Sequence, residues 1–157
     1  MMDYCLVRLT SNDYRNFRKA YAQIVYSFAE KGTMFDREAE KFSSKIATET
    51  NLRTKTEFLK DLESREMYFF QVDGETKGYV ELIFKGRTCD IYEFSVFEHG
   101  KGLGTILFEE TMRIIKEREC TKIELWCPFP GAQVFWKKNG FQPFYKNKRM
   151  YFRKKVR

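Results

Sequence analysis

The residues with the clearest chemical potential are three alternating glycines in the segment His99-Gly100-Lys101-Gly102-Leu103-Gly104. An apolar, strand-like run precedes this segment, and a run with helical spacing follows it, which predicts a loop that opens a helix. Glycine lets the backbone approach a ligand closely, and the unpaired amides of a helix's first turn attract anions. The loop therefore predicts a phosphate or pyrophosphate site, and the alternative is an ordinary glycine-rich turn with a solvated lysine.

Two common phosphate-binding motifs do not fit this loop. A P-loop needs Ser or Thr directly after its lysine, whereas Gly102 follows Lys101. The dinucleotide fingerprint needs its last glycine one position later than Gly104 and a preceding parallel βαβ unit, which the sequence does not predict. The loop is therefore neither a P-loop nor a dinucleotide-binding fingerprint.

The elements around the loop predict an α+β fold. Apolar spacing predicts helices with N-cap residues at Ser11-Asn12-Asp13, at Asp36 and at Thr54. Strands are predicted over Tyr4–Leu9, Met67–Val72, Gly78–Phe84, Cys89–Phe97, Lys122–Cys127, Phe141–Tyr145 and Met150–Val156, and two later helices over Leu103–Glu117 and Pro130–Asn139. A meander followed by a strand–helix–strand unit predicts a sheet that changes from antiparallel to locally parallel.

Length and composition limit the classes of protein to which the chain can belong. Its 157 residues predict one domain, and 43% apolar residues exclude intrinsic disorder. No apolar run approaches the roughly 18–20 residues of a membrane span, and the N-terminus lacks the features of a signal peptide. We therefore expect a soluble cytoplasmic protein that has no membrane partner.

The charge balance and the cysteines address partners and metals. The 29 basic and 22 acidic residues give a net charge of +7, which favours an anionic partner without naming it. The four cysteines form no Cys-x-x-Cys pair and are accompanied by one histidine, so a zinc cluster is not expected. They are expected to be reduced, mostly buried thiols. A carboxylate site for magnesium is not excluded.

Two segments together resemble a known family. The segment His99-Gly100-Lys101-Gly102-Leu103-Gly104 is similar to the acyl-CoA-binding motif Gln/Arg-x-x-Gly-x-Gly/Ala of the GNAT superfamily of N-acetyltransferases. Ala132-Gln133-Val134-Phe135-Trp136-Lys137-Lys138-Asn139-Gly140-Phe141 resembles the family's later Ala-x-x-x-Tyr-x-x-x-Gly-Phe helix. The resemblance implies a single GNAT-like domain over residues 1–157, with a mixed, mainly antiparallel central sheet flanked by helices. It also implies transfer of an acetyl group from acetyl-CoA to a primary amine by direct attack on the thioester, without a metal.

The resemblance also implies roles for individual residues. The pyrophosphate of CoA would lie on the loop amides, and the pantetheine arm would follow the preceding strand, where a backbone N–H would donate to the thioester oxygen. The implied cofactor-binding residues are Ser95, Val96, His99, Gly100, Lys101, Gly102, Leu103, Gly104, Thr105, Phe135 and Trp136. The chain departs from the family at three of its positions: His99 replaces Gln/Arg, Trp136 replaces the usual tyrosine, and Phe129 replaces a frequent asparagine.

The strand before the loop contains the best candidate for a general base. Glu93 lies between apolar neighbours, so partial burial would raise its pKa toward neutrality. The alternative for Glu93 is a solvated strand carboxylate or a partner for one of the many lysines. Glu81, one strand earlier, is the reserve candidate, acting through water. An indole cannot supply a proton at neutral pH, so Tyr145 and Cys127 are the candidate acids in place of Trp136.

The C-terminal segment alternates basic and aromatic residues. Such a pattern is found on nucleic-acid surfaces, but a strand with one buried and one solvated face explains it better, so a nucleic-acid partner is not expected. The expected partner is a small-molecule amine, or a peptide or protein amine, and the sequence is compatible with a homodimer. Two other functions remain as alternatives: a CoA-binding or regulatory module with little transferase activity, and a basic nucleic-acid-binding domain.

Overall fold

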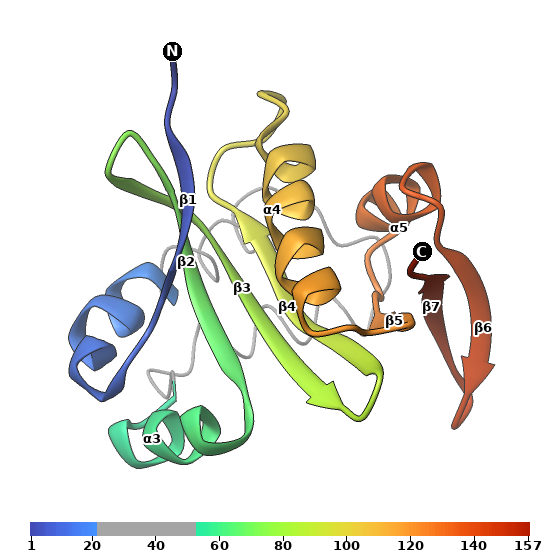
Figure 1. Cartoon of the computed structure of the whole chain (residues 1–157), viewed down its shortest axis with the longest axis horizontal. Coiled ribbons are helices and arrows are strands. Elements are labelled where there is room, and N and C mark those ends of the chain that lie inside the picture. Colours follow the sequence, from blue (N-terminus) through green and yellow to red (C-terminus); the bar gives the residue numbers. More distant parts are fainter. Residues whose placement is uncertain (22–52) are drawn as a thin grey trace.

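A seven-stranded sheet forms the centre of the computed structural model, which describes residues 1–21 and 53–157 (Figure 1). Its strands are β1 (Tyr4–Arg8), β2 (Glu66–Val72), β3 (Glu75–Lys85), β4 (Thr88–Val96), β5 (Lys122–Trp126), β6 (Gln142–Lys146) and β7 (Arg149–Lys155). The described helices are the 3-10 helix Ser11–Asp13, which continues as an α-helix through 14–21, then α3 (Lys55–Ser64), α4 (Leu103–Glu117) and α5 (Pro130–Lys138). The helix predicted from Asp36 lies outside the described residues.

The order of the strands confirms the predicted α+β class. The sheet has the order β1-β2-β3-β4-β5-β7-β6, and every neighbouring pair is antiparallel except β4 and β5, which are parallel. The predicted meander is therefore β2-β3-β4, and α4 is the crossover to β5. None of the described helices has the length and apolar character that crossing a membrane would require.

Some element boundaries differ from the prediction. The strand β3 begins at Glu75 rather than Gly78. Asp73 and Gly74 both have positive φ and form a tight two-residue turn, so β2 and β3 are already paired at Val72 and Glu75. The first helix is capped by Thr10 and not by Ser11-Asn12-Asp13: the Thr10 hydroxyl accepts from the Asn12 amide at 3.3 Å, and the Asp13 carboxylate accepts from the Thr10 amide at 2.6 Å.

The sheet has a separate core on each face. Val80 and Leu82 point toward α4 and α5, while Tyr79 lies among the residues that pack the other face against α3 and the helix at 14–21. The stripe of α4 consists of the buried residues Leu103, Leu107, Phe108, Thr111 and Ile115. Each side chain of β4 points to one of these two faces, and the face determines which helices it contacts.

The strands β4 and β5 stay together for only a short distance. They pair at Thr88–Asp90 with Lys122–Glu124, and beyond Asp90 no further pair joins them. The Phe97 amide donates to the Lys77 carbonyl of the β3 side at 2.9 Å, and antiparallel alternation then directs the N–H of Val96 away from β3, toward β5. The last part of β4 thus presents backbone groups to the space between the two strands.

A β-bulge lies in the middle of β4. Glu81 pairs with Glu93, but the next residue, Leu82, pairs with Ile91, so Tyr92 is an extra residue on β4. The bulge shifts the alternation of side chains, and Glu93 therefore lies on the same face as Glu81 although Ile91 packs in the opposite core. This irregularity decides where the candidate base points.

Gly78 is required where β3 approaches β4 closely. A Cβ at this position would lie 2.7 Å from the carbonyl oxygen of Ser95. We expect Gly78→Ala to lower the free energy of unfolding by about 1–3 kcal/mol, measured by urea denaturation, because the strands must move apart. Gly131→Ala is the control, since a Cβ there meets nothing within 4 Å. Equal denaturation midpoints for the two variants would contradict this expectation.

Candidate functional site

The glycine loop forms an open N-terminus for α4. Gly102 is the N-cap with φ 73°, Gly100 has φ 80°, and no side chain caps the helix. A Cβ added to either glycine would meet nothing within 4 Å. The amides from Leu103 to Thr105 precede the Ile106 amide, which donates to the Gly102 carbonyl at 3.4 Å, and as first-turn amides of α4 they can donate to an anion.

Three charged side chains lie beside the loop. The Glu98 carboxylate accepts from Lys101 Nζ at 2.6 Å and from Lys77 Nζ at 3.0 Å. The hydrogen bond from Lys101, with that from Lys77, lowers the pKa of Glu98 to about 2. Lys101 was predicted from the sequence, but its partner Glu98 was not. An anion bound at the loop would compete with Glu98 for Lys101.

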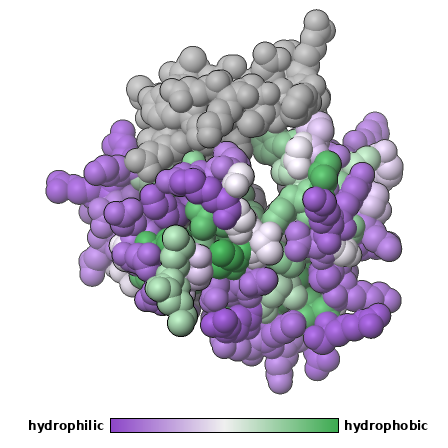
Figure 2. All heavy atoms as spheres, turned by 90° about the horizontal axis from the view of Figure 1, so that it is seen from above, coloured by the Kyte–Doolittle hydropathy of each residue, from purple (hydrophilic) through white to green (hydrophobic). Residues whose placement is uncertain are grey.

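The other predicted cofactor residues lie along β4 and α5. Ser95 and Val96 form the end of β4, and His99 lies in the loop. Phe135 of α5 packs against the start of α4: its ring would lie 3.5 Å from a Cβ added to Gly104. Seen from the end where α4 begins, hydrophobic side chains show in a hollow between two lobes of the surface (Figure 2). The structure thus places these residues around one end of the sheet.

Trp136 belongs to the hydrophobic core. It is 4% exposed, and its ring contacts Phe94, Phe108, Phe135 and Phe141 at centroid distances of 4.9 to 5.8 Å. Its neighbour Cys127 is also buried. Its thiol donates to the Phe129 carbonyl at 3.6 Å. Burial raises the pKa of the Cys127 thiol to about 11, although hydrogen bonding with Phe129 and Trp136 acts in the opposite direction. The thiol is therefore protonated at neutral pH.

Tyr145 is exposed, in contrast to the buried Trp136 and Cys127. It lies on β6, the outermost strand, and 75% of it is exposed. Two strands, β7 and β5, separate β6 from β4. No hydrogen bond within the described part of the chain joins Tyr145 to Glu93, and its role as an acid stays a prediction.

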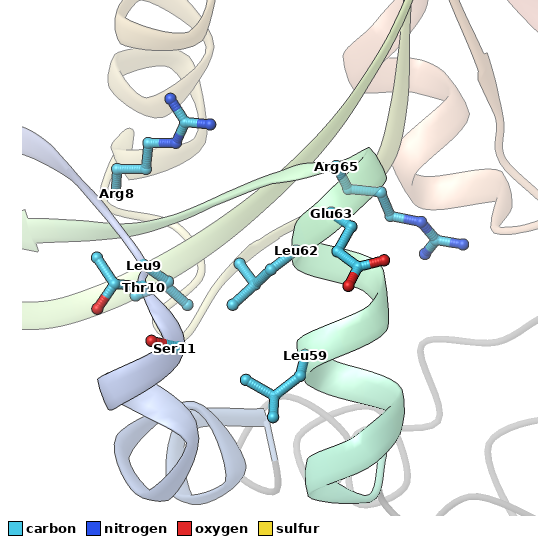
Figure 3. A pocket seen from close by; sticks show the side chains of 8 residues that line it. All are labelled: Arg8, Leu9, Thr10, Ser11, Leu59, Leu62, Glu63 and Arg65. Atoms are coloured by element: carbon cyan, nitrogen blue, oxygen red, sulfur yellow. The ribbon is translucent and has the colours of Figure 1, made fainter.

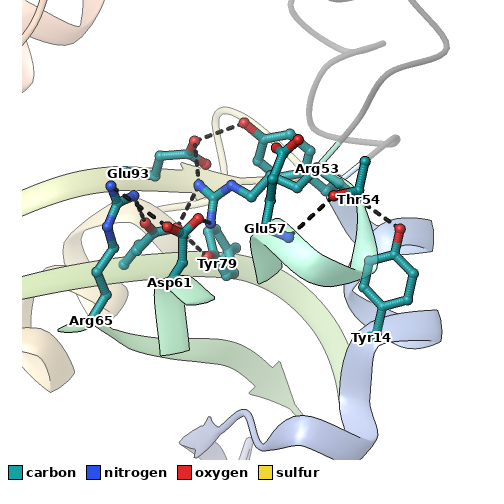
Figure 4. Close-up of polar contacts among 10 residues, drawn as sticks. Tyr14, Arg53, Thr54, Glu57, Asp61, Arg65, Tyr79 and Glu93 are labelled. Atoms are coloured by element: carbon teal, nitrogen blue, oxygen red, sulfur yellow. Dashed lines mark hydrogen bonds and ion pairs between the residues drawn. The ribbon is translucent and has the colours of Figure 1, made fainter. Parts of the chain in front are cut away.

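Glu81 is the most completely paired carboxylate. Its side chain is 0% exposed, and its Oε2 accepts from Arg65 at 2.6 Å, while Oε1 accepts from Arg53 at 2.8 Å and from the Tyr79 hydroxyl at 2.5 Å (Figure 4). Two guanidinium groups and one hydroxyl thus occupy both oxygens of this buried carboxylate. This arrangement leaves the reserve base no exposed surface.

Glu93 is held more loosely than Glu81, which lies opposite it on β3. Its Oε1 accepts from the Tyr21 hydroxyl at 2.7 Å and from Arg53 Nη2 at 3.4 Å, and 22% of the side chain is exposed. Burial, with the charge of Glu81, raises the pKa of Glu93 to about 7, although Arg53 and the hydrogen bond from Tyr21 act in the opposite direction. A carboxylate with this pKa can accept and release a proton near neutral pH.

Arg53 and Arg65 complete what we call the carboxylate cluster, which consists of Glu81, Glu93, Asp61, Arg53 and Arg65 (Figure 4). Sequence reasoning missed both arginines and Asp61. The available signal was in Tyr79 and Glu81, two polar groups on one face of the apolar middle of β3. Asp61 lies on α3, and Arg53 and Arg65 lie just outside its two ends, so no spacing in the sequence links them to β3.

A shallow pocket lies elsewhere, between the end of β1 and α3 (Figure 3). Its lining residues are Arg8, Leu9, Thr10, Ser11, Leu59, Leu62, Glu63 and Arg65. Arg65 belongs to both the pocket and the carboxylate cluster, whereas the glycine loop contributes nothing to the pocket. Among residues 1–21 and 53–157, no group of three or more His, Cys, Asp or Glu side chains could hold a metal ion.

Solved structures show a similar fold. The PaiA N-acetyltransferase from Thermoplasma acidophilum, in complex with coenzyme A, has a TM-score of 0.72 and 15% identity, and the match covers 98% of this chain and 99% of that one. An acetyltransferase from Thermus thermophilus has a TM-score of 0.68 and 14% identity, with 98% and 97% covered. A GNAT acetyltransferase from Elizabethkingia anophelis with acetyl-CoA bound has a TM-score of 0.54 and 18% identity, with 66% and 84% covered.

Sequence comparison identifies the family. No curated protein matches the chain significantly. Residues 32–141 match the profile of the family described as Acetyltransferase (GNAT) family, which is more than half of the chain. The match includes both segments that carried the resemblance, the glycine loop and the helix α5 up to Phe141. The chain therefore belongs to the GNAT acetyltransferase family.

Proposed function

We propose that this chain, as one domain over residues 1–157, transfers the acetyl group of acetyl-CoA to a primary amine. The observation that carries the proposal is that one strand, β4, combines three features. It separates from β5 after Asp90, it ends at the open glycine loop, and it carries a carboxylate with a pKa of about 7. The solved neighbours with bound CoA and acetyl-CoA support this choice of cosubstrate.

The loop would hold the pyrophosphate of CoA. The amides of Gly102 to Thr105 supply donors, and Lys101 supplies a positive charge once its contact with Glu98 is shared. His99 and Phe135 border the same end of the sheet. The pantetheine arm would then follow Ser95 and Val96 into the space that β5 leaves.

The backbone of β4 would stabilise the charge that develops during attack. The N–H of Val96 points toward the space between β4 and β5 and would donate to the thioester oxygen as it becomes negative. This contact refines the prediction for Ser95 and Val96, because alternation gives only Val96 an amide on that side.

Glu93 would accept the proton of the attacking amine. In the ionised form, its carboxylate takes a proton from the acceptor's ammonium group, and the free amine attacks the acetyl carbonyl carbon. The tetrahedral intermediate then breaks the carbon–sulfur bond, and CoA leaves as a thiolate that is protonated to the thiol. The amide and CoA are the products.

The proton for the leaving thiolate need not come from a dedicated side chain. A cysteine thiol has a pKa of about 8.5. The similar thiolate of CoA is therefore a tolerable leaving group, and solvent can protonate it. We expect Tyr145→Phe and Trp136→Tyr each to change kcat by less than about twofold, measured by thiol release. A tenfold loss in Tyr145→Phe would assign the acid role to Tyr145, and a tenfold gain in Trp136→Tyr would show a phenol placed near the sulfur.

One observation favours a second candidate function. Trp136, at the position of the family's tyrosine, is buried among aromatic rings, and a CoA-binding module with little transferase activity would need no acid there. Thermal unfolding with CoA tests both candidates, because a ligand that binds the native state raises the melting temperature. An unchanged melting temperature across the CoA titration would exclude both.

A further inference from the structure

The guanidinium of Arg53 lies among three carboxylates. Its Nη2 lies 2.8 Å from Glu81 Oε1 and 3.4 Å from Glu93 Oε1, and its Nη1 lies 3.3 Å from Asp61 Oδ2. Figure 4 shows the Arg53 side chain between Glu93 and Asp61. Carboxylates from three different elements, β3, β4 and α3, therefore converge on one positive group.

Aromatic rings line the same site. The rings of Phe17 and Tyr21 each have their centroids 5.5 Å from the Arg53 guanidinium carbon, and that of Tyr92 lies at 6.0 Å. Aromatic faces at this range attract ammonium ions as well as guanidinium ions. The walls of the site thus select for positive charge without requiring the planar shape of arginine.

Among the described residues, the carboxylate cluster has one more acidic side chain than basic side chains. Within it, the three carboxylates of Glu81, Glu93 and Asp61 face the two guanidinium groups of Arg53 and Arg65. The deficit falls on Glu93, whose contact with Arg53 is the longest of the Arg53 ion pairs and whose side chain keeps some exposed surface. A further cation that arrived at Glu93 would balance the cluster.

Arg53 has a second partner toward which it can move. Its Nη1 is buried and makes no hydrogen bond to any residue that the structure describes, although Asp61 Oδ2 is only 3.3 Å away. A small shift of the guanidinium toward Asp61 would satisfy this donor and keep the bond to Glu81, while giving up the weak contact with Glu93. The backbone of Arg53 is fixed, because the Tyr14 hydroxyl donates to its carbonyl at 2.9 Å.

We propose that Arg53 occupies the acceptor's ammonium site in the free protein and that a primary ammonium group takes this site by displacing Arg53 from Glu93 onto Asp61. The inference rests on the proposed function in that Glu93 is the base. It assigns Arg53 as a positioning residue that acts through Glu93. Withdrawal of the guanidinium also makes Glu93 more basic at the moment when it must accept the ammonium proton, because the Arg53 charge favours the ionised carboxylate.

Binding of n-butylammonium chloride tests this proposal without acetyl-CoA. The readout is the NMR shift of the Glu93 carboxyl carbon in glutamate-labelled protein at pH 8. We expect Arg53→Gln to lower the Kd for n-butylammonium several-fold, because the internal competitor is gone. Asp61→Asn should raise it several-fold, because Arg53 loses its alternative partner. Arg113→Gln is the matched control, since Arg113 forms an exposed ion pair with Glu110 on α4.

The competing account is that Arg53 only stabilises the fold. In that case Arg53→Gln would bind n-butylammonium no more tightly than the wild type, and this result would overturn the proposal, as would the absence of saturable binding in both proteins. If Arg53→Gln does not fold, an unchanged Kd in Asp61→Asn overturns it. Where butylamine is acetylated, Arg53→Gln should lower KM more than kcat. A failure of CoA binding would contradict the proposed function and leave this result unaffected.

Discussion

Glu93→Gln is expected to lower kcat for acetyl transfer by roughly a hundredfold or more at pH 7 and to leave acetyl-CoA affinity nearly unchanged. The amide keeps the size of the side chain but cannot accept the ammonium proton. The Glu93 side chain lies on the same face of the sheet as Glu81 of β3 and contacts Tyr21 of the first helix, apart from the glycine loop. Stopped-flow or thiol-release kinetics with a primary amine give kcat, and calorimetry gives the affinity for acetyl-CoA.

The pH dependence separates this role from a structural one. Since Glu93 titrates with a pKa of about 7, wild-type kcat/KM should rise with pH through 7, and the variant should lack this rise. The difference between the two proteins should shrink as the amine loses its own proton at higher pH. Superimposable pH–rate profiles would remove Glu93 from the mechanism.

The stability of the same variant should move in the opposite direction. The folded protein raises the pKa of Glu93 from an ordinary value of 4.5 to about 7, so the native state binds more protons than the unfolded state in that window. Stability contributed by this group is therefore lost as the pH rises from 4.5 through 7. Glu93→Gln should melt higher than the wild type at pH 8, and the gain should vanish near pH 4.5.

Gly102→Glu is expected to abolish CoA binding, the second large effect. Gly102 is the N-cap of α4 with φ 73°, and the space beside it is open to a ligand. A glutamate places a side chain and a negative charge where the loop amides would meet the pyrophosphate. Isothermal calorimetry with CoA measures the loss.

Gly86→Glu is the control for Gly102→Glu. Gly86 lies in the turn between β3 and β4 with φ 58° and nothing within 4 Å of a Cβ, so this variant adds the same charge and a similar backbone strain at the other end of β4. It should melt lower than the wild type and still bind CoA. Retained CoA binding in Gly102→Glu, or its loss in Gly86→Glu, would show that the loop does not hold the cosubstrate.

Local patterns were sufficient to predict most of the fold. The helix start at Leu103 follows from Gly102, and the turn at Asp73-Gly74 follows from its dipeptide, because both depend on backbone conformations that few residues adopt. The N-cap at Thr54 is likewise local, since its hydroxyl accepts from the Glu57 amide at 3.1 Å. In each case the neighbours in sequence are also the neighbours in space.

The position of Glu93 could not be derived from alternation alone. Ile91 packs in the core beside α4, so an unbroken strand would point Glu93 to that face as well. The bulge at Tyr92 reverses this, and Phe94 packs on the side of Ile91 instead. The spacing of three between these two apolar residues is the only trace that the bulge leaves in the sequence.

The partners of Glu93 come from distant segments. Tyr21 is 72 residues and Arg53 is 40 residues away in sequence, and both reach Glu93 only after the helices pack on the sheet. No spacing rule joins such residues, because the contacts are set by tertiary packing. For the same reason the sequence indicated a base on β4 but not the arginine that competes for it.

The proposed transfer of an acetyl group from acetyl-CoA to a primary amine can be measured directly. The most direct measurement incubates the purified protein with isotope-labelled acetyl-CoA and a panel of small and peptide amines, and follows both products by mass spectrometry. The account predicts a labelled amide and an equal amount of free CoA thiol with the wild type, and a strongly reduced yield with Glu93→Gln. Saturable acetyl-CoA binding without a labelled amide on any amine of the panel would contradict it.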